Sequence, residues 1–105
     1  AYDSANAYLR AWTLGPGQQL VPRWERPGLG CASHMLLYED SGEVVTNDHQ
    51  GLREDVVVLD ITTGRELARA HTGGRMQGVV FPSPGWNGDF YWCSMDRIAR
   101  LHVTD

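Results

Sequence analysis

The residues best suited to chemistry lie in one polar stretch of the sequence, from Thr46 to Glu54. Within it, Asp48 and His49 offer a carboxylate and an imidazole, the groups that bind a metal ion or move a proton, and Arg53 adds a cation. A solvated loop explains the same residues without chemistry, because neighbours in sequence rarely converge on one atom and no further ligands follow at a recognisable spacing. Asp48, His49 and Arg53 are therefore candidate ligand contacts, and both interpretations stay open.

A second candidate site is the segment His71–Arg75, which joins two β-rich parts of the chain. Gly73 and Gly74 would let backbone N–H groups approach an anion, and the guanidinium of Arg75 would pair with it. A flexible crossover with a surface arginine is the commoner explanation of such a glycine pair. His71 and Arg75 are the candidate contacts in this segment.

Other chemistries find little support in the residue types. All 9 basic residues are arginine, so the chain has no lysine for a Schiff base or a P-loop phosphate contact. Cys31 and Cys93 have the spacing of neither a metal site nor a redox pair, and we expect free thiols. No serine stands in the Gly-x-Ser-x-Gly pattern of a nucleophile elbow. The sequence identifies no cofactor.

The totals describe one ordinary domain. A chain of 105 residues with 42% hydrophobic content is long enough to bury a core without disulfide or metal staples. The net charge is −4 and the basic residues are spread along the chain, so we expect no nucleic-acid partner. No apolar run approaches the ~20 residues of a membrane-spanning helix, so we expect no membrane span. The start at Ala1 lacks the regions of a secretory signal, which we interpret as removed or absent.

The elements that must position these residues are predicted to be strands, because short β-branched and aromatic runs alternate with Gly, Pro, Asn and Asp. Turn signals such as Asp40-Ser41-Gly42 predict hairpin after hairpin. A helix over Gly64–Ala70 is the one competitor, and its shortness favours a strand there. The predicted strands are Tyr8–Leu14, Gln19–Trp24, His34–Glu39, Glu43–Asn47, Asp55–Ile61, Glu66–His71, Gln77–Pro82, Phe90–Met95 and Ile98–Val103.

The strand pattern repeats along the chain. The segment Ala11–Leu20 aligns with Val58–Leu67, so that Gly17 corresponds to Gly64, and a weaker third copy starts at Ala99. Periods of about 40 to 50 residues that contain four strands are typical of β-propeller blades. We therefore predict an all-β fold of antiparallel four-stranded propeller blades, divided as 1–33, 34–75 and 76–105.

The length has a consequence for this prediction, because it accommodates about two blades whereas a ring needs roughly four to eight. Either several copies associate, or the chain is one piece of a larger polypeptide, or the strands close on themselves as a small sandwich. The first two alternatives make other copies or other blades the partners of this chain.

The stretch Val56–Leu67 resembles the repeat of the PQQ-like propellers, the superfamily that includes YVTN-type and quinoprotein amine dehydrogenase-like propellers. Asp60, Thr63 and Gly64 match the turn of that repeat, in which the next strand often carries a docking tryptophan; Ala68 stands near that position here. We expect Asp60 to accept hydrogen bonds from the backbone of the turn, and Gly64 to close it in the left-handed conformation. The resemblance implies an extracytoplasmic, periplasmic or secreted, location.

A propeller is a scaffold that serves many unrelated functions, so the fold alone carries no activity. We expect a scaffold that binds a small-molecule ligand or another protein through the loops around His49 and Arg75. One alternative is an enzyme, part of a quinoprotein-like dehydrogenase or of a propeller hydrolase whose other site residues lie on other blades or chains. A third alternative is a purely structural assembly module.

Overall fold

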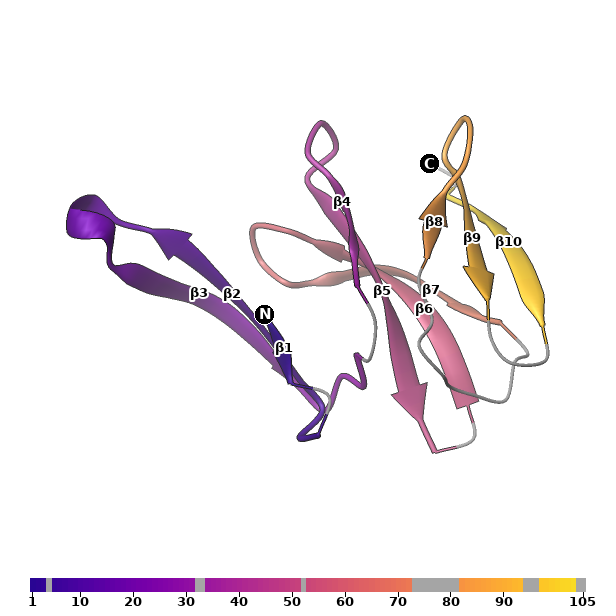
Figure 1. The fold of residues 1–105 in the computed structure, drawn as a ribbon, viewed down its shortest axis with the longest axis horizontal. Helices are drawn as coiled ribbons and strands as arrows, with labels where there is room; N and C mark the ends of the chain where they lie inside the picture. Colours follow the sequence, from indigo (N-terminus) through magenta and orange to yellow (C-terminus); the bar gives the residue numbers. More distant parts are fainter. Residues whose placement is uncertain (4, 32–33, 52, 73–81, 94–96, 104–105) are drawn as a thin grey trace.

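The computed structural model describes residues 1–3, 5–31, 34–51, 53–72, 82–93 and 97–103. Its strands form three antiparallel sheets that follow one another along the chain (Figure 1). The first sheet has the strand order β1-β2-β3, the middle sheet β4-β5-β6-β7, and the third sheet β8-β9-β10. The predicted all-β antiparallel fold is confirmed, whereas its arrangement as propeller blades stays a prediction.

Each sheet is built from strands that are consecutive in sequence. The first sheet contains β1 (Tyr2–Asp3), β2 (Tyr8–Leu14) and β3 (Leu20–Pro27), with the short 3-10 turn η1 (Pro16–Gln18) between the last two. The middle sheet contains β4 (Leu36–Tyr38), β5 (Glu43–Gln50), β6 (Arg53–Asp60) and β7 (Glu66–His71). The third sheet contains β8 (Ser83–Pro84), β9 (Asp89–Cys93) and β10 (Ile98–His102).

Most predicted strands are found close to their expected bounds. β2 and β7 match them residue for residue, which confirms the strand rather than the helix over Glu66–His71. β1 and β8, two residues each, are strands that the sequence does not predict. The predicted strand Gln77–Pro82 lies outside the described residues except for Pro82, which is not in a strand.

The prediction that Thr46–Glu54 is a loop is wrong. β5 continues to Gln50 and β6 begins at Arg53, so that only a tight turn separates the two strands. Gly51 in this turn has a φ of 61°, a conformation that costs glycine little. The buried carboxylates of this stretch remain in the sheet because they are hydrogen-bonded to neighbouring polar side chains and to Arg69, and buried polar groups that are paired carry little penalty.

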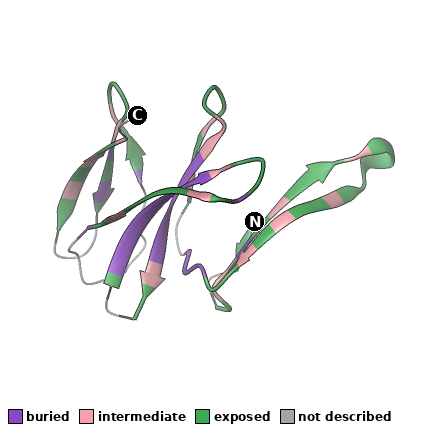
Figure 2. Cartoon of the chain, turned by 180° about the vertical axis from the view of Figure 1, so that it is seen from behind, coloured by how far each residue is buried: buried purple, intermediate pink, exposed green. Residues whose placement is uncertain are grey.

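The middle sheet lies between the other two and is covered on both faces (Figures 1 and 2). Successive side chains of a strand point to opposite faces, so Val44 and Val45 belong to different cores. The first interface, against the first sheet, consists of Leu9, Leu29, Cys31, Val44, Val57 and Leu59, with Trp24 and Met35 partly buried. The second interface, against the third sheet, consists of Val45, Val56, Val58, Phe90 and Trp92, with Leu36, Tyr38, Ala99, Leu101 and Val103 partly buried.

The turn between β6 and β7 has the expected local geometry. Oδ1 of Asp60 accepts hydrogen bonds from the backbone N–H groups of Thr62 and Thr63, at 2.7 and 3.0 Å. Gly64 has a φ of 74°, and its N–H donates to the backbone oxygen of Asp60 at 2.8 Å. The backbone bonds from Thr63 and Thr62 hold the pKa of the Asp60 carboxyl below its usual value. The turn is therefore closed by its own residues, as the sequence predicts.

Directed contacts join this turn to the first sheet. Nε1 of Trp24, on β3, donates to the backbone oxygen of Ile61 at 2.9 Å. The indole lies against Gly64, where an added Cβ would come within 2.5 Å of the ring. Nη1 of Arg26, on the same strand, donates to the backbone oxygen of Gly64 at 2.9 Å. These contacts fix the position of β3 relative to the turn between β6 and β7.

Candidate functional site

The candidate site lies at the end of the middle sheet where β5 turns into β6. The antiparallel register pairs Asp48 with Asp55 and His49 with Glu54. Because alternate residues of a strand face opposite ways, the two aspartates face the first sheet, whereas His49 and Glu54 face the third. Asp48, Glu54 and Asp55 are all buried. Buried carboxylates must be paired with cations or hydrogen-bond donors, and the surrounding residues supply both.

On the face toward the first sheet, Arg69 bridges the two aspartates. Its Nη1 donates to Oδ2 of Asp48 at 2.8 Å and to Oδ2 of Asp55 at 2.9 Å. Its Nε and Nη2 donate to the two carboxylate oxygens of Glu66, each at 2.8 Å. Such a two-bond pair fixes the plane of the guanidinium. Arg69 is therefore the organising cation of this face.

Asp55 has two further partners. Nε of Arg53 donates to its Oδ1 at 3.0 Å, and Nδ1 of His71 lies 3.1 Å from the same oxygen. Burial alone would raise the pKa of Asp55, but the hydrogen bonds from Arg69 and from these two residues outweigh it and hold that pKa below its usual value. The hydrogen bonds between Arg69 and Glu66 likewise lower the pKa of Glu66 and raise that of Arg69. Within the ion cluster of this face, Asp55, Glu66 and Arg69 therefore stay charged at neutral pH.

On the opposite face, a buried carboxylate holds an imidazole. Nδ1 of His49 lies 2.9 Å from Oε2 of Glu54, and Nδ2 of Asn47 donates to Oε1 of Glu54 at 2.7 Å. The Glu54 side chain is 1% exposed and that of His49 27%. A carboxylate at Nδ1 fixes the orientation of the ring and leaves Nε2 for another group. This arrangement can bind a ligand through one hydrogen bond or transfer a proton.

Asp48 also has a structural task. Its Oδ1 accepts from the backbone N–H of Gly30 at 2.8 Å and from Nε2 of Gln50 at 2.7 Å. The backbone N–H of His49 donates to the oxygen of Gly30 at 2.9 Å, and a Cβ at Gly30 would collide with the His49 backbone. Asp48 therefore anchors the segment Leu29–Cys31 beside β5, and glycine is the residue that permits this close approach.

The structure brings most of the predicted contact residues to one end of the middle sheet, but not to one point. Asp48, Arg53 and His71 belong to the ion cluster, whereas His49 lies on the other face. Arg75 lies outside the described residues. The predicted contacts therefore fall into two groups. Asp48, Arg53 and His71 are bonded to other side chains of the ion cluster, whereas the His49 imidazole is partly exposed.

The residues that hold this site without being among the predicted contacts include Glu54, Asp55 and Arg69. A signal for the first two is present in the sequence, because a tight turn at Gly51 makes β5 and β6 pair by their distance from it, which sets Glu54 opposite His49. Arg69 carries no comparable signal. It reaches the site from β7, and its partners depend on how that strand pairs with β6.

The described ranges also contain the two cysteines and His, Asp and Glu side chains outside this site. No group of three or more His, Cys, Asp or Glu side chains in them is arranged to bind a metal ion. No helix in this part of the chain is long and apolar enough to cross a membrane. Cys31 is buried and Cys93 is exposed, and both are free thiols. Burial raises the pKa of the Cys31 thiol.

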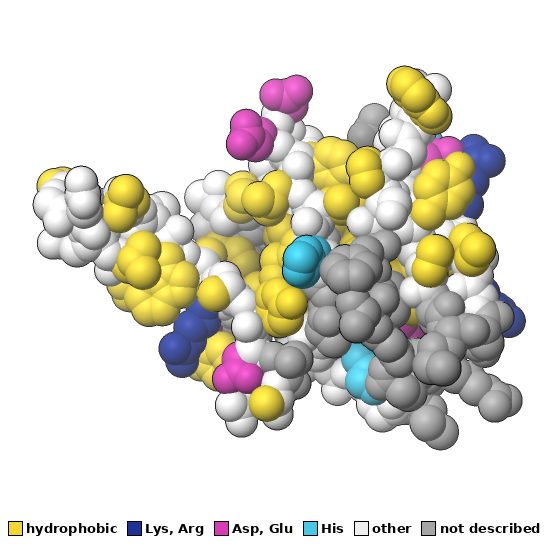
Figure 3. Space-filling view, in the orientation of Figure 1, with side chains coloured by type: hydrophobic (Ala, Val, Ile, Leu, Met, Phe, Trp, Pro, Cys, Tyr) yellow, Lys and Arg dark blue, Asp and Glu magenta, His cyan; other side chains and the backbone are white. Residues whose placement is uncertain are grey.

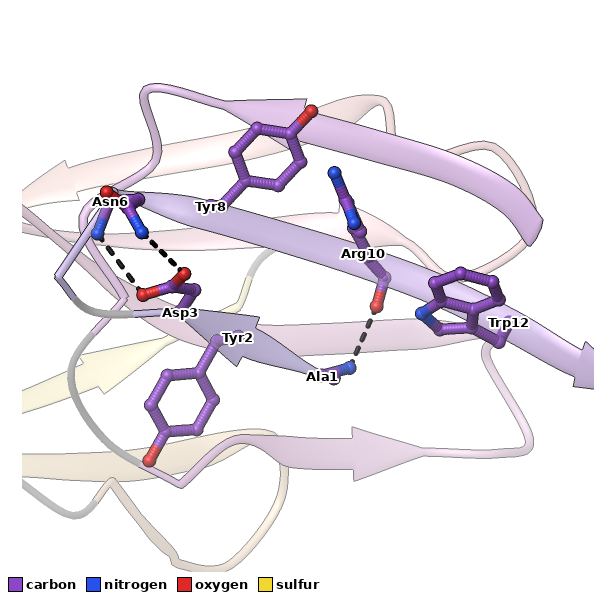
Figure 4. Close-up of a pocket in the computed structure, with 7 residues that line it drawn as sticks. All are labelled: Ala1, Tyr2, Asp3, Asn6, Tyr8, Arg10 and Trp12. Carbon is purple, nitrogen blue, oxygen red and sulfur yellow. Dashed lines mark hydrogen bonds between the residues drawn. The ribbon is translucent and has the colours of Figure 1, made fainter. Parts of the chain in front are cut away.

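A separate recess lies on the first sheet (Figure 4). This aromatic pocket has a volume of about 450 Å³ and is lined by Ala1, Tyr2, Asp3, Asn6, Tyr8, Arg10 and Trp12. None of these residues is among the predicted contacts. The signal for them is weak, since an alternation of aromatic and charged residues along one strand is also common on solvated sheet faces.

Comparison of the chain with family models, with curated proteins and with solved structures finds no match.

Proposed function

We propose that this chain is a segment of a β-propeller of the PQQ-like or YVTN type and that it serves as a binding and assembly scaffold. In this proposal each sheet is a blade or part of a blade, and other blades, on the same polypeptide or on other copies, cover the outer faces of the first and third sheets. The polar end of the middle sheet then presents ligand contacts from a rigid support.

The observation that carries the proposal is the contact of Trp24 with the turn between β6 and β7. The repeat that Val56–Leu67 resembles has an Asp-to-Gly turn and a docking tryptophan. Ala68 stands where that tryptophan is expected in sequence, yet the turn does receive one, because Trp24 donates to the oxygen of Ile61 and lies against Gly64. The tryptophan comes from the preceding sheet, and this contact links consecutive sheets as a blade-to-blade contact would.

The way in which the sheets bury each other also supports the proposal. The middle sheet has four consecutive antiparallel strands, and both of its faces are covered by neighbouring sheets. The outer sheets keep large hydrophobic side chains in solvent, among them Leu14 at 68% exposure and Ile98 at 73%. Propeller blades bury such faces against the next blade. The exposed side chains therefore favour further sheets as partners.

The measurement that tests the proposal is the solution mass of this 11.7 kDa chain, by light scattering on a size-exclusion column at several concentrations. We expect a stable association of copies, and a closed ring of stacked sheets when the associated species is imaged by electron microscopy. A well-folded monomer at every concentration would overturn the proposal, because the outer faces would then need no neighbour.

A second candidate function is a propeller hydrolase, which the pair of His49 and Glu54 favours. An imidazole oriented by a buried carboxylate is suited to act as a general base. Replacing His49 by Gln would abolish turnover of a hydrolysed substrate while leaving its binding within about tenfold, since one hydrogen bond contributes about 0.5 to 1.5 kcal/mol of net affinity. An unchanged rate in this variant would exclude His49 as the base.

A further inference from the structure

The aromatic pocket of the first sheet has walls of two kinds. Tyr8 and Trp12 project from β2, and Tyr2 from β1 (Figure 4). Arg10 lies between Tyr8 and Trp12, whereas Asp3 and Asn6 lie together at the end away from Trp12 (Figure 4). The volume of about 450 Å³ is within the range of roughly 300 to 1,000 Å³ found for small-molecule sites.

The polar wall is held in place by its own hydrogen bonds. Oδ1 of Asp3 accepts from the backbone N–H groups of Ala5 and Asn6, at 3.1 and 3.2 Å, and Oδ2 accepts from Nδ2 of Asn6 at 2.8 Å. Such a turn fixes both side chains relative to the backbone. The Asn6 amide keeps its oxygen and one N–H hydrogen free of this contact, so it offers an acceptor and a donor side by side.

The charge of the pocket is nearly balanced. The guanidinium of Arg10 lies 4.4 Å from the centre of the Tyr8 ring and 3.4 Å from the carboxylate of Glu25. Asp3 adds a further negative charge at the other end, and the N-terminal ammonium of Ala1, which donates to the backbone oxygen of Arg10 at 2.8 Å, adds a further positive one. An anionic ligand would therefore find both cations already engaged and a carboxylate nearby, whereas a neutral ligand with hydroxyl groups would find donors and acceptors without an electrostatic cost.

Aromatic faces beside fixed amide, carboxylate and guanidinium groups match the two surfaces of a sugar ring. The C–H face of a pyranose is apolar and stacks on an indole or a phenol ring, while its edge carries hydroxyls that both donate and accept. We propose that the aromatic pocket binds a short neutral saccharide, with Trp12 as the stacking surface and Asn6, Asp3 and Arg10 as the hydroxyl contacts.

Hydrophobic side chains are also exposed elsewhere on the first sheet, where Figure 3 shows them on the surface. Leu14 and Leu20 are 68% and 66% exposed, but they are aliphatic and lie at the far end of β2 and the start of β3. They do not line the pocket. The saccharide is therefore assigned to the pocket alone.

The test is a titration of the whole chain with cellobiose, maltose and N,N′-diacetylchitobiose, followed by calorimetry and by NMR chemical shifts. We expect at least one of the three to bind saturably, with shifts of the Trp12 indole and Asn6 amide signals. The Trp12→Ala variant should weaken binding at least tenfold and Asn6→Ala about tenfold, because the remaining groups then lose a partner.

A matched control is Trp86→Ala, since Trp86 is 86% exposed and lies outside the pocket. It should bind the same saccharide with unchanged affinity. Equal loss in the Trp12 and Trp86 variants, shifts that map elsewhere, or no saturable binding of any of the three saccharides would overturn the assignment.

This inference stands apart from the propeller scaffold, and the experiment separates the two. If another sheet covers the pocket, Trp12→Ala will lower the mass seen by light scattering and saccharide will not bind. That result would overturn the saccharide site while it supports association. Saccharide binding by a chain that stays monomeric would support the site and contradict the scaffold.

Discussion

The two faces of the middle sheet are covered in different ways. The first interface packs mainly leucine and valine side chains, and it also contains two hydrogen bonds, from Trp24 to Ile61 and from Arg26 to Gly64. The second interface buries the aromatic rings of Phe90 and Trp92. Apolar burial supplies most of the free energy of folding, whereas hydrogen bonds decide where two surfaces meet. The second interface should therefore contribute more to the free energy of unfolding, whereas the first should fix the relative position of its two sheets more closely.

The indole of Trp92 makes the difference plain. Trp92 is 0% exposed, and its Nε1 has no hydrogen-bond partner within the part of the chain that the structure describes. The partly buried Trp24, in contrast, donates its N–H to Ile61. Trp92 thus fills the core of the second interface but leaves its N–H donor unpaired. Trp24 instead fixes the position of the first sheet through its hydrogen bond. The predictions below test this contrast, from the largest expected effect to the smallest.

Replacing Trp92 by Ala should have the largest effect. It removes the largest fully buried side chain and leaves a cavity in the second interface, at a cost of about 4 kcal/mol in the free energy of unfolding. Urea denaturation followed by far-UV circular dichroism measures this loss. Trp86→Ala, at an exposed position, is the control and should change the midpoint little. A loss below about 1 kcal/mol at Trp92 would mean that the second interface is not the stronger one.

Replacing Gly64 by Ala should have the next largest effect, at the first interface. The new Cβ would meet the ring of Trp24 and would sit on a backbone with a φ of 74°, which together cost about 2 kcal/mol. Gly28→Ala is the matched control, because Gly28 has a similar φ of 77° and nothing within 4 Å of an added Cβ. Comparing the two urea midpoints isolates the contact with Trp24. Equal losses would show that only the backbone conformation matters.

Acid should weaken the ion cluster on the face toward the first sheet. The pKa of Asp55 is lower in the fold than in the unfolded chain, where it is about 3.9. Its contribution to stability is therefore complete above that unfolded value and disappears as the pH falls through the lower folded value. In Asp55→Asn, the urea midpoint should fall less between pH 7 and pH 3 than in the unmodified chain. Asp40→Asn, in an exposed turn, should retain the full acid dependence.

The smallest effect concerns reactivity rather than stability. Cys31 belongs to the buried first interface, where burial raises the pKa of its thiol, whereas Cys93 is exposed. A thiol reagent such as Ellman's should modify Cys93 rapidly and Cys31 only as fast as the first interface opens. The Cys93→Ser variant should lose the fast phase. A fast reaction at Cys31 in that variant would show that the first interface opens readily.

Sequence reasoning identifies the strands whose signals are local. β2 matches its predicted bounds because alternating side chains and flanking turn residues define it, and β7 matches because the competing helix would be too short. β1 and β8 cannot be found in this way, since two residues carry no periodicity and become strands only through pairing with β2 and β9. The same limit explains the polar ends of β5 and β6, where strand continues because side chains from elsewhere satisfy the buried groups.

The candidate site shows a similar division. The types of Asp48 and His49 single them out in the sequence, but their faces follow only from the register of β5 with β6. Arg69 is an unremarked arginine in the sequence, and it becomes the centre of the ion cluster through its position on β7. Local residue types therefore predict which stretch is polar, and pairing between strands decides what that stretch does.

Because the tryptophans are buried to different extents, their intrinsic fluorescence can be used to follow unfolding. Trp92 is 0% exposed and Trp24 is partly buried, whereas Trp12 and Trp86 are 40% and 86% exposed. An indole in an apolar core fluoresces at shorter wavelength than one in water. With Trp12 and Trp86 replaced by Phe, the fluorescence would come from Trp24 and Trp92 alone. A shift of its emission maximum during unfolding would then show when the indoles at the two interfaces become exposed to water.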